Sequence, residues 1–225
     1  MHRTEPKMVF QIVTLFPERY RYFLESGLPS KGLKKALLEL RFRQLRHYAD
    51  PGRGGRIDDL PYGGGPGMVL QVGPIHRAIQ SFPDQYPVVL FTPRGKRLNQ
   101  QMVRSFSSLP GLTLVSGYFE GVDERVAANL VDYQISLGDF ILGSGDAAAI
   151  CFLESVSRLI PGFMGSDESH QEESHEVEGA LEYPQYTRPP EYQDWEVPPI
   201  LLSGDHGKIE QWRKEQSLKL SEKMQ

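Results

Sequence analysis

Short apolar runs alternate with helical patterns over the first three quarters of the chain. Four runs of strand length are present, at residues 9–15 (VFQIVTL), 88–92, 112–116 and 134–137. Apolar residues recur at helical spacing over three further segments, 100–109, 123–131 and 147–159. Such an alternation of strands and helices predicts an α/β domain with a mostly parallel sheet.

The segment between the first two apolar runs carries weaker signals. Pro17 is predicted to open a helix with one apolar face. Ser30 is a candidate N-cap for a second helix, GLKKALLEL at residues 32–40. Residues 41–48 (RFRQLRHY) alternate basic and less polar side chains, which favours a strand with a cationic face.

The alternation stops after the third helical pattern. Residues 166–182 contain few apolar side chains, which indicates a mobile, solvated linker. Several prolines interrupt the next stretch, and an amphipathic helix is predicted over residues 208–220. We therefore expect three parts: an α/β domain at 1–162, a flexible acidic linker at 163–185 and a small C-terminal helical domain at 186–225.

Composition excludes several classes of protein. Cys151 is the sole cysteine of the 225 residues, which excludes a disulfide framework or a Cys-rich zinc site and suits a reducing compartment. The longest apolar run, residues 147–153, is much shorter than the ~18 residues of a membrane span. The first residues, MHRTEPKMVFQ, lack the apolar stretch of a signal peptide. We expect a soluble, cytoplasmic protein without a membrane partner.

The formal net charge of −4 argues at first against a nucleic-acid partner, because such proteins usually carry a basic surface. The distribution of charge weakens this argument. Residues 166–196 hold 1 Lys+Arg against 10 Asp+Glu, whereas residues 1–60 hold 12 against 7. A short acidic segment thus conceals a basic N-terminal quarter. Its arginines, available to meet phosphates, include Arg41, Arg43, Arg46, Arg53 and Arg56.

Two glycine-rich segments are candidates for ligand binding. Residues 58–70 (DDLPYGGGPGMVL) allow tight turns and a close approach of a ligand to the backbone, although such segments are more often plain loops. Neither Gly95-Lys96 nor Gly207-Lys208 has the preceding glycine of a Walker phosphate loop. Residues 143–148 (GSGDAA) fit the dinucleotide pattern G-x-G-x-x-A, but they follow the last predicted strand instead of the first.

Three predicted strands end in glycine-containing segments, at residues 92–95, 117–121 and 137–142. Ligands of open α/β sheets bind at the carboxyl ends of the strands. We therefore expect these three segments to line one pocket, in which backbone groups contact a small cofactor. Their spacing alone does not identify the cofactor.

Six segments in series resemble the bacterial tRNA (guanine-N1)-methyltransferase (TrmD) family: PYGGGPGM at 61–68, EGVDERV at 120–126, SLGDFIL at 136–142, SRLIPG at 157–162, EYPQYTRP at 182–189 and VPPILLSGDHGKIEQWRKEQSL at 197–218. The resemblance implies a homodimer of the SPOUT class with a deep trefoil knot in its parallel sheet. It also implies S-adenosylmethionine as cofactor and methylation of N1 of guanine 37 in tRNA. The C-terminal domain would then bind tRNA.

The resemblance implies roles for particular residues. The cofactor site would be formed by Leu90, Thr92, Pro93, Gly95, Gly117, Glu120, Leu137, Gly138, Asp139, Phe140, Ile141, Leu142, Gly145 and Ala148. Glu173, in the linker, would be the catalytic acid–base residue, because a carboxylate can accept the N1 proton during methyl transfer. Arg158 would lie near the target base and stabilise negative charge on the guanine oxygen. No metal site is implied.

This chain departs from the family pattern at several of these positions. Tyr118 stands where the family has the arginine of R-Y-E-G, and Glu173 and Glu182 replace linker aspartates. The C-terminal helical domain is expected to be shortened. These changes leave open a non-catalytic RNA-binding relative that keeps the fold and the cofactor pocket. The pattern at residues 143–148 leaves a nicotinamide-dependent dehydrogenase as a further alternative.

Overall fold

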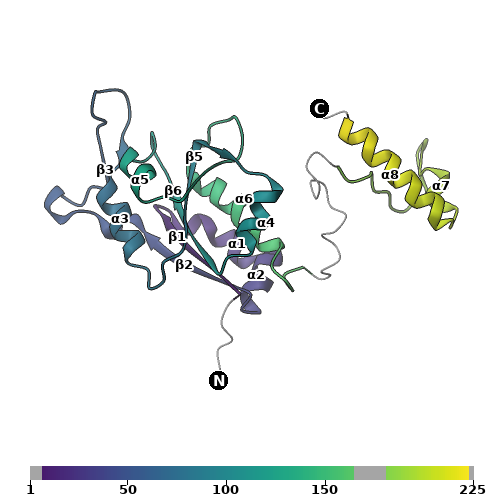
Figure 1. Cartoon of the computed structure of the whole chain (residues 1–225), viewed down its shortest axis with the longest axis horizontal. Coiled ribbons are helices and arrows are strands. Elements are labelled where there is room, and N and C mark those ends of the chain that lie inside the picture. Colours follow the sequence, from purple (N-terminus) through teal and green to yellow (C-terminus); the bar gives the residue numbers. More distant parts are fainter. Residues whose placement is uncertain (1–6, 165–180, 223–225) are drawn as a thin grey trace, which may run out of the picture. The chain divides into compact units, whose positions relative to one another are not determined.

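The computed structural model describes residues 7–164 and 181–222. The chain divides into two compact units, residues 1–167 and residues 168–225, and each is considered by itself (Figure 1). Glu173 and most of the predicted linker lie outside the described residues.

A five-stranded sheet forms the centre of the first unit. Its strands are β1 (Met8–Thr14), β2 (Leu38–Gln44), β5 (Val88–Arg97), β6 (Gly111–Ser116) and β7 (Tyr133–Ser136). They are arranged in the order β2-β1-β6-β5-β7, and every pair is parallel. The expectation of an α/β domain with a parallel sheet is confirmed.

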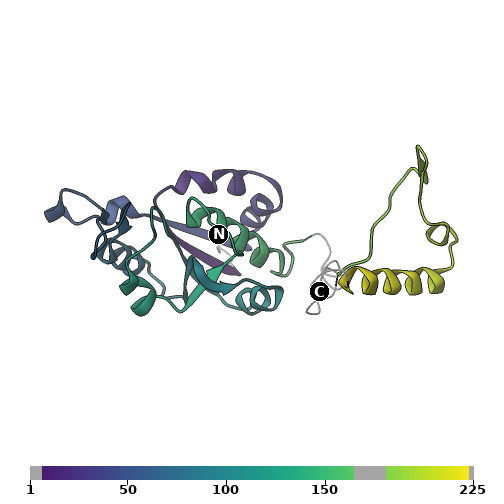
Figure 2. The ribbon, with the colours of Figure 1, turned by 90° about the horizontal axis from the view of Figure 1, so that it is seen from above.

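Two layers of helices cover the sheet because apolar residues point to both of its faces. In β1, Met8 and Ile12 face one hydrophobic cluster and Val13 faces the other. The first cluster is covered by the 3₁₀ helix η1 and three α-helices: η1 (Pro17–Tyr20), α1 (Arg21–Glu25), α4 (Gln100–Ser107) and α6 (Gly145–Arg158). The second is covered by η2 (Leu45–Tyr48), α3 (Val72–Gln80) and α5 (Glu124–Asn129). Figures 1 and 2 show the strands between α3 and α5 on one side and α1, α4 and α6 on the other.

The predictions for the N-terminal quarter were partly wrong. The second helix, α2, spans Gly27–Lys34, so it begins before the predicted 32–40 segment and ends within it. Leu38 starts β2 instead, because it pairs with Met8 in the parallel ladder. Ala36, with a φ of 55°, forms the turn between them. Tertiary pairing here overrides the helical propensity of the segment. The cationic strand ends at Gln44, and η2 follows it.

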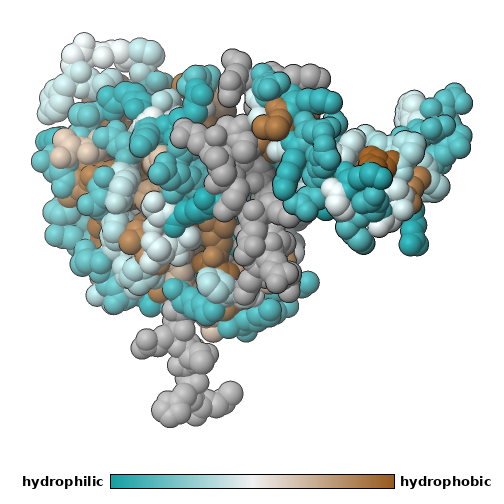
Figure 3. Space-filling view, turned by 45° about the vertical axis from the view of Figure 1, so that its right-hand side comes forward, coloured by the Kyte–Doolittle hydropathy of each residue, from teal (hydrophilic) through white to brown (hydrophobic). Residues whose placement is uncertain are grey.

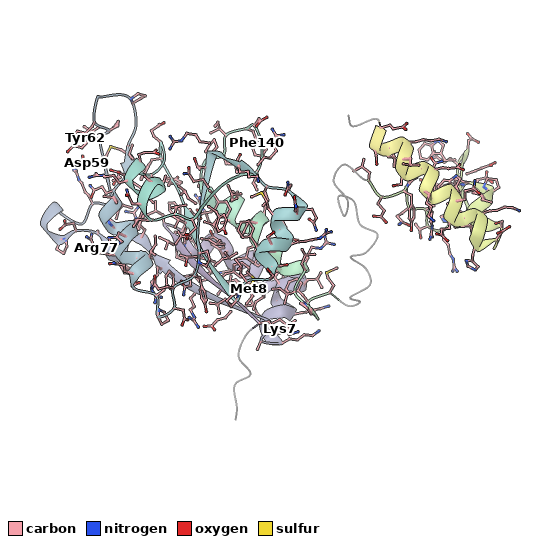
Figure 4. All side chains as sticks on the ribbon, viewed as in Figure 1. Lys7, Met8, Asp59, Tyr62, Arg77 and Phe140 are labelled. Atoms are coloured by element: carbon pink, nitrogen blue, oxygen red, sulfur yellow. The ribbon has the colours of Figure 1, made fainter. Side chains whose placement is uncertain are left out.

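The glycine-rich segment at residues 58–70 forms a narrow ribbon. Strands β3 (Asp58–Asp59) and β4 (Val69–Leu70) pair antiparallel. The turn between them contains four glycines with positive φ, a conformation that other L-residues rarely adopt: Gly63, Gly64, Gly65 and Gly67. Tyr62 is fully exposed at this turn (Figure 4).

Strand β5 pairs with β7 twice. Phe91 pairs with Ile135, residues 92–95 leave the ladder, and Lys96 then pairs with Ile135 again. The backbone of Gly95 therefore lies directly against β7. A Cβ atom on Gly95 would stand 2.5 Å from the backbone nitrogen of Ile135.

The described part of the second unit contains no buried side chain. It consists of a hairpin, β8 (Glu191–Tyr192) and β9 (Trp195–Glu196), followed by α7 (Pro199–Leu202) and α8 (His206–Glu222). The predicted terminal helix is thus present and extends slightly at both ends. The backbone at Leu181 is tied to α8 through hydrogen bonds with Ser217 and Ser221.

Most of the visible surface is hydrophilic, with scattered apolar residues (Figure 3). Within the described residues, no helix combines the length and apolar character needed to cross a bilayer.

We predict that Gly95→Ala lowers the free energy of unfolding by about 1–3 kcal/mol, because the added methyl group overlaps the backbone of β7. Urea denaturation measures this change. Gly143→Ala is the matched control, since a Cβ there meets no atom within 4 Å. Equal stabilities of the two variants would contradict the packing argument.

Candidate functional site

A cavity of about 520 Å³ opens at the carboxyl ends of β5, β6 and β7. This is the place predicted from the three glycine-containing strand ends. Twelve of the fourteen expected cofactor residues line it: Leu90, Thr92, Pro93, Gly117, Glu120, Leu137, Gly138, Phe140, Ile141, Leu142, Gly145 and Ala148. Phe140 is exposed at this site (Figure 4). Its neighbour Ile141 is exposed as well.

The two remaining expected residues lie beside the cavity but do not line it. The backbone of Gly95 packs directly against the backbone of β7, as described above. Asp139 forms an ion pair with Arg97, which lowers the pKa of its carboxyl group. This ion pair joins the end of β5 to the segment after β7. Arg94 and Tyr118, which belong to the segments 92–95 and 117–121 expected to line the pocket, also contribute to it. Ser144, just before Gly145, is a further lining residue that was not assigned to the cofactor site.

The floor of the cavity depends on two glycines in contact. The amide of Gly145, at the start of α6, donates a 2.8 Å hydrogen bond to the carbonyl of Gly117, which follows β6. A Cβ on Gly145 would stand 2.8 Å from the Gly117 nitrogen. No larger residue fits at position 145, so the two loops approach as closely as backbones allow.

The carboxylate of Asp146, next to Gly145, is buried with 2% of the residue exposed. Its Oδ1 accepts hydrogen bonds from Thr14 Oγ1 at 2.6 Å and from the Tyr20 hydroxyl at 3.3 Å. Its Oδ2 accepts one from Arg19 Nη1 at 3.0 Å. These partners offset the cost of burying a charge. They also tie the start of α6 to the end of β1 and to η1.

The Tyr20 hydroxyl is buried within the same network, 3.0 Å from Ser116 Oγ at the end of β6. Burial raises the pKa of the Tyr20 phenol, and the negative charge of Asp146 raises it further. The phenol therefore stays protonated under conditions in which an exposed tyrosine ionises.

Arg19 extends this network to the cavity wall. Its Nη1 also donates to Ser144 Oγ at 2.7 Å. Its guanidinium lies 4.2 Å from the ring centroid of Phe16 and 5.6 Å from that of Tyr118. The tyrosine that stands in place of the family arginine is thus next to a cation supplied by η1.

The glycine-rich ribbon supports the opposite wall of the cavity. The Glu120 amide donates to the Met68 carbonyl at 3.0 Å, and the Leu70 amide donates to the Gly121 carbonyl at 3.0 Å. The Glu120 side chain lies against Gly67, so closely that a Cβ at position 67 would collide with it. Phe119 takes a φ of 58°, a conformation that is strained for a phenylalanine.

Neither of the two expected catalytic residues is brought to this cavity within the described part of one chain. Arg158 ends α6, ten residues beyond Ala148. At about 1.5 Å rise per residue, it lies about 15 Å farther along the helix axis. Glu173 falls outside the described residues.

The described residues give the cavity a mixed chemical character. Glycine backbones and apolar side chains make up most of its lining, with Arg94 and Glu120 as charged groups. Arg94 pairs with Glu124 at 2.5 Å. Among the described residues, no cluster of three His, Cys, Asp or Glu side chains is arranged to hold a metal ion. The helix that begins within residues 143–148 follows β7, the last strand of the sheet in chain order. The helix of a dinucleotide-binding motif follows the first strand instead.

These features define an α/β protein with a ligand pocket at the carboxyl edge of a parallel sheet. The sequence profile described as tRNA (Guanine-1)-methyltransferase TrmD matches residues 8–225, and the chain belongs to this family. The predicted family resemblance is confirmed.

Three relatives named tRNA (guanine-N(1)-)-methyltransferase illustrate the similarity. The protein from Methylacidiphilum infernorum is 46% identical over 96% of this chain and 94% of its own length. Those from Geobacter sp. and Microcystis aeruginosa are each 45% identical over 94% of this chain, covering 86% and 92% of their own lengths.

We predict that Tyr20→Phe reduces the loss in free energy of unfolding that the wild-type protein shows as the pH rises above 10. Below pH 10, the phenol is neutral in both folded and unfolded chains. Above it, the unfolded chain ionises while the folded chain resists, so stability falls by about 1.4 kcal/mol per pH unit. The phenylalanine variant lacks this loss, although at neutral pH it is less stable by about 1–3 kcal/mol because Asp146 loses a donor.

Urea unfolding at several values between pH 8 and pH 11 measures both effects. Tyr22→Phe is the matched control, because Tyr22 is 83% exposed two residues farther along. If Tyr20→Phe and wild type lost stability in parallel above pH 10, Tyr20 would not be the group responsible.

Proposed function

We propose that this chain is an enzyme that transfers a methyl group from S-adenosylmethionine to N1 of guanine 37 in tRNA. The cavity at the three glycine-containing strand ends carries the proposal, since it lies in a chain whose family and relatives are named for tRNA guanine methylation. The sole cysteine and the tRNA substrate favour a cytoplasmic location.

The cavity fits S-adenosylmethionine in size and chemistry. A volume of about 520 Å³ lies within the range of small-molecule sites. The backbones of Gly117 and Gly138 can present amide and carbonyl groups to a nucleoside, while Leu90 and Ile141 supply apolar contacts. Glu120 offers a carboxylate to a cationic ligand. When bound, the cofactor supplies a methyl group activated by its sulfonium.

The trefoil knot is part of the proposal. General topology rules disfavour knots, so the sequence pattern alone does not predict one. The double pairing of β5 with β7 supports it, because residues 92–95 loop out and return at Lys96 to the same strand. The contact of Gly145 with Gly117 brings the chain after β7 back against the end of β6.

The position of Arg158 supports a homodimer. Its place at the far end of α6 puts it beyond reach of its own chain's cavity. We therefore propose that Arg158 serves the cavity of a second copy, so that each site is built from both protomers. The C-terminal unit would then help to hold the tRNA.

The chemistry assigns one role to each expected catalytic residue. Guanine N1 carries a hydrogen and is a poor nucleophile until that proton leaves. The Glu173 carboxylate would accept this proton. S-adenosylmethionine, when bound, would supply the methyl group to N1, its carbon–sulfur bond breaking to leave a neutral thioether. The Arg158 guanidinium stabilises the negative charge that develops on the guanine oxygen. The base leaves its stack to enter the site, as in other base-modifying enzymes.

One observation favours a second candidate. Tyr118 lines the cavity at the position where the family resemblance implies an arginine. A non-catalytic RNA-binding relative would keep the cavity and lose methyl transfer. Transfer of tritium-labelled methyl groups to an unmodified tRNA transcript with guanine at positions 36 and 37 distinguishes the two. Intact S-adenosylmethionine binding without incorporation at high enzyme concentration would support the second candidate.

We expect Glu173→Gln to lower turnover strongly in this assay while the affinity for S-adenosylmethionine stays within about twofold. The amide cannot accept the N1 proton, whereas the cavity lining is unchanged. Glu172→Gln is the matched control in the same segment. Normal turnover of Glu173→Gln would remove Glu173 from the role of base.

Calorimetry tests the dehydrogenase alternative. Binding of NAD without binding of S-adenosylmethionine would favour the dehydrogenase.

Mixed dimers test whether Arg158 acts across protomers. One protomer carries Arg158→Ala, and the other carries Gly143→Trp, designed to fill the cavity from a lining position where an added Cβ meets no atom within 4 Å. Each variant alone is expected to be inactive. The mixed dimer is expected to recover about half of the wild-type turnover, because one intact cavity receives Arg158 from the other protomer. An inactive mixed dimer, with one functional cavity shown by cofactor binding, would mean that Arg158 serves its own chain.

A further inference from the structure

The two arginines of the edge strand β2, Arg41 and Arg43, differ in whether carboxylates pair with them. Arg41 is neutralised: its Nε lies 2.6 Å from Glu39 Oε1 and its Nη1 lies 2.5 Å from Asp84 Oδ2. These hydrogen bonds raise the pKa of the Arg41 guanidinium. The charge of Arg41 is therefore directed at carboxylates of its own chain.

Arg43, two residues farther along the same strand, is held only by neutral groups. Its Nε donates to Ser81 Oγ at 2.8 Å, and its Nη2 donates to the Ser81 carbonyl at 3.1 Å. Its guanidinium lies 4.5 Å from the ring centroid of Phe82. Within the described ranges, no carboxylate forms an ion pair with it, so its position is fixed while its charge remains uncompensated.

Arg77, on the exposed side of α3, is held in a similar way. Its Nε and Nη2 both donate to the Tyr48 carbonyl, at 3.1 Å and 2.7 Å. Its Nη1 makes no hydrogen bond with the described residues, and no described carboxylate pairs with it. The Tyr48 hydroxyl lies 2.8 Å from Ser81 Oγ, so the partner of Arg77 and the partner of Arg43 are themselves hydrogen-bonded.

Neighbouring groups add to this cationic character. Arg46 and His47 are exposed on η2, and His76 is exposed beside Arg77 on α3. Asp50 is the nearest acid along the chain from Tyr48, and its carboxylate caps the backbone of Gly52 at 2.9 Å. We call Arg43, Arg46 and Arg77 the arginine surface.

The arginine surface lies at the same edge of the sheet as the cavity. The sheet is parallel, η2 follows the carboxyl end of β2, and the cavity lies at the carboxyl ends of β5, β6 and β7. Three strand spacings separate β2 from β5, about 14 Å at the usual spacing. Figure 4 shows Arg77 at the left of the first unit, Lys7 and Met8, where β1 begins, toward its lower right, and Phe140, beside the cavity, at its upper right.

We propose that the arginine surface binds the phosphate backbone of the tRNA whose target guanine enters the cavity. Fixed guanidinium groups without acidic partners are suited to phosphate oxygens, and such contacts fix the register of the nucleic acid without reading its sequence. This proposal rests on the proposed function, because it names the surface that positions the same substrate.

The test measures binding of an unmodified tRNA transcript with guanine at position 37, over a series of salt concentrations. Arg43→Gln and Arg77→Gln are each expected to weaken binding about tenfold at moderate salt. Each is also expected to reduce the slope of log K against log salt concentration by about 1. The KM for tRNA should rise by a similar factor, with S-adenosylmethionine affinity unchanged.

Arg21→Gln is the charge-matched control. Arg21 belongs to α1, in the helix layer on the other face of the sheet, and its contact with Glu25 is exposed. The Arg21→Gln substitution also removes one positive charge, and it is expected to change tRNA affinity less than twofold. Arg77→Lys keeps the charge and is expected to retain the salt slope, even if the loss of the paired bonds to Tyr48 weakens binding modestly.

The possible outcomes separate this proposal from the proposed function. If wild type methylates the transcript but Arg43→Gln and Arg77→Gln match Arg21→Gln, the arginine surface is not a tRNA contact. Weaker binding with an unchanged salt slope would also overturn it, because the lost contacts would not be ionic. If wild type neither binds nor methylates the transcript, the proposed function itself fails.

Discussion

The buried carboxylate of Asp146 is the interaction on which the geometry of the cavity depends. A charge enclosed by protein is tolerated only where several donors satisfy it, and here the donors come from Thr14, Arg19 and Tyr20. Tyr20 in turn reaches Ser116. The end of β1, the end of β6, η1 and the start of α6 therefore cannot move independently. The contact between Gly117 and Gly145 lies within this frame, and the cavity lies in front of it.

The other boundaries of the cavity are fixed in different ways. The ribbon at residues 58–70 uses backbone hydrogen bonds and the absence of a side chain at Gly67, whereas the ends of β5 and β7 use the surface ion pair of Arg97 with Asp139. Exposed ion pairs contribute little to stability. The wall between β5 and β7 is therefore held mainly by the strand pairing, in which both Phe91 and Lys96 pair with Ile135, and the ion pair only adds to it.

The sequence pattern predicted the parallel sheet, most of its helices and the location of the cavity, because apolar periodicity and the strand-end rule are local signals. It failed where long-range contacts decide. Leu38 belongs to a strand because of its pairing with Met8, and α3 was missed because Gly73 and Pro74 in its first turn resemble a loop. The hydrogen bond of Thr14 with Asp146 joins residues 132 positions apart. No local pattern indicates such a contact, so the residues that shape the cavity floor were not predicted.

The roles of individual charged residues also depend on long-range contacts that the sequence does not show. Counting by segment already revealed a basic N-terminal quarter beneath a net charge of −4. Counting cannot distinguish Arg41 from Arg43, which lie on the same strand with the same alternation. Their difference arises because Arg41 forms ion pairs with Glu39 and Asp84. Arg43 instead donates to Ser81 and lies over the ring of Phe82. Arg77, outside the basic quarter, joins Arg43 only through the fold. What a polyanionic substrate meets is therefore set by which arginines lack acidic partners, a property of packing that neither the total nor the segmental charge records.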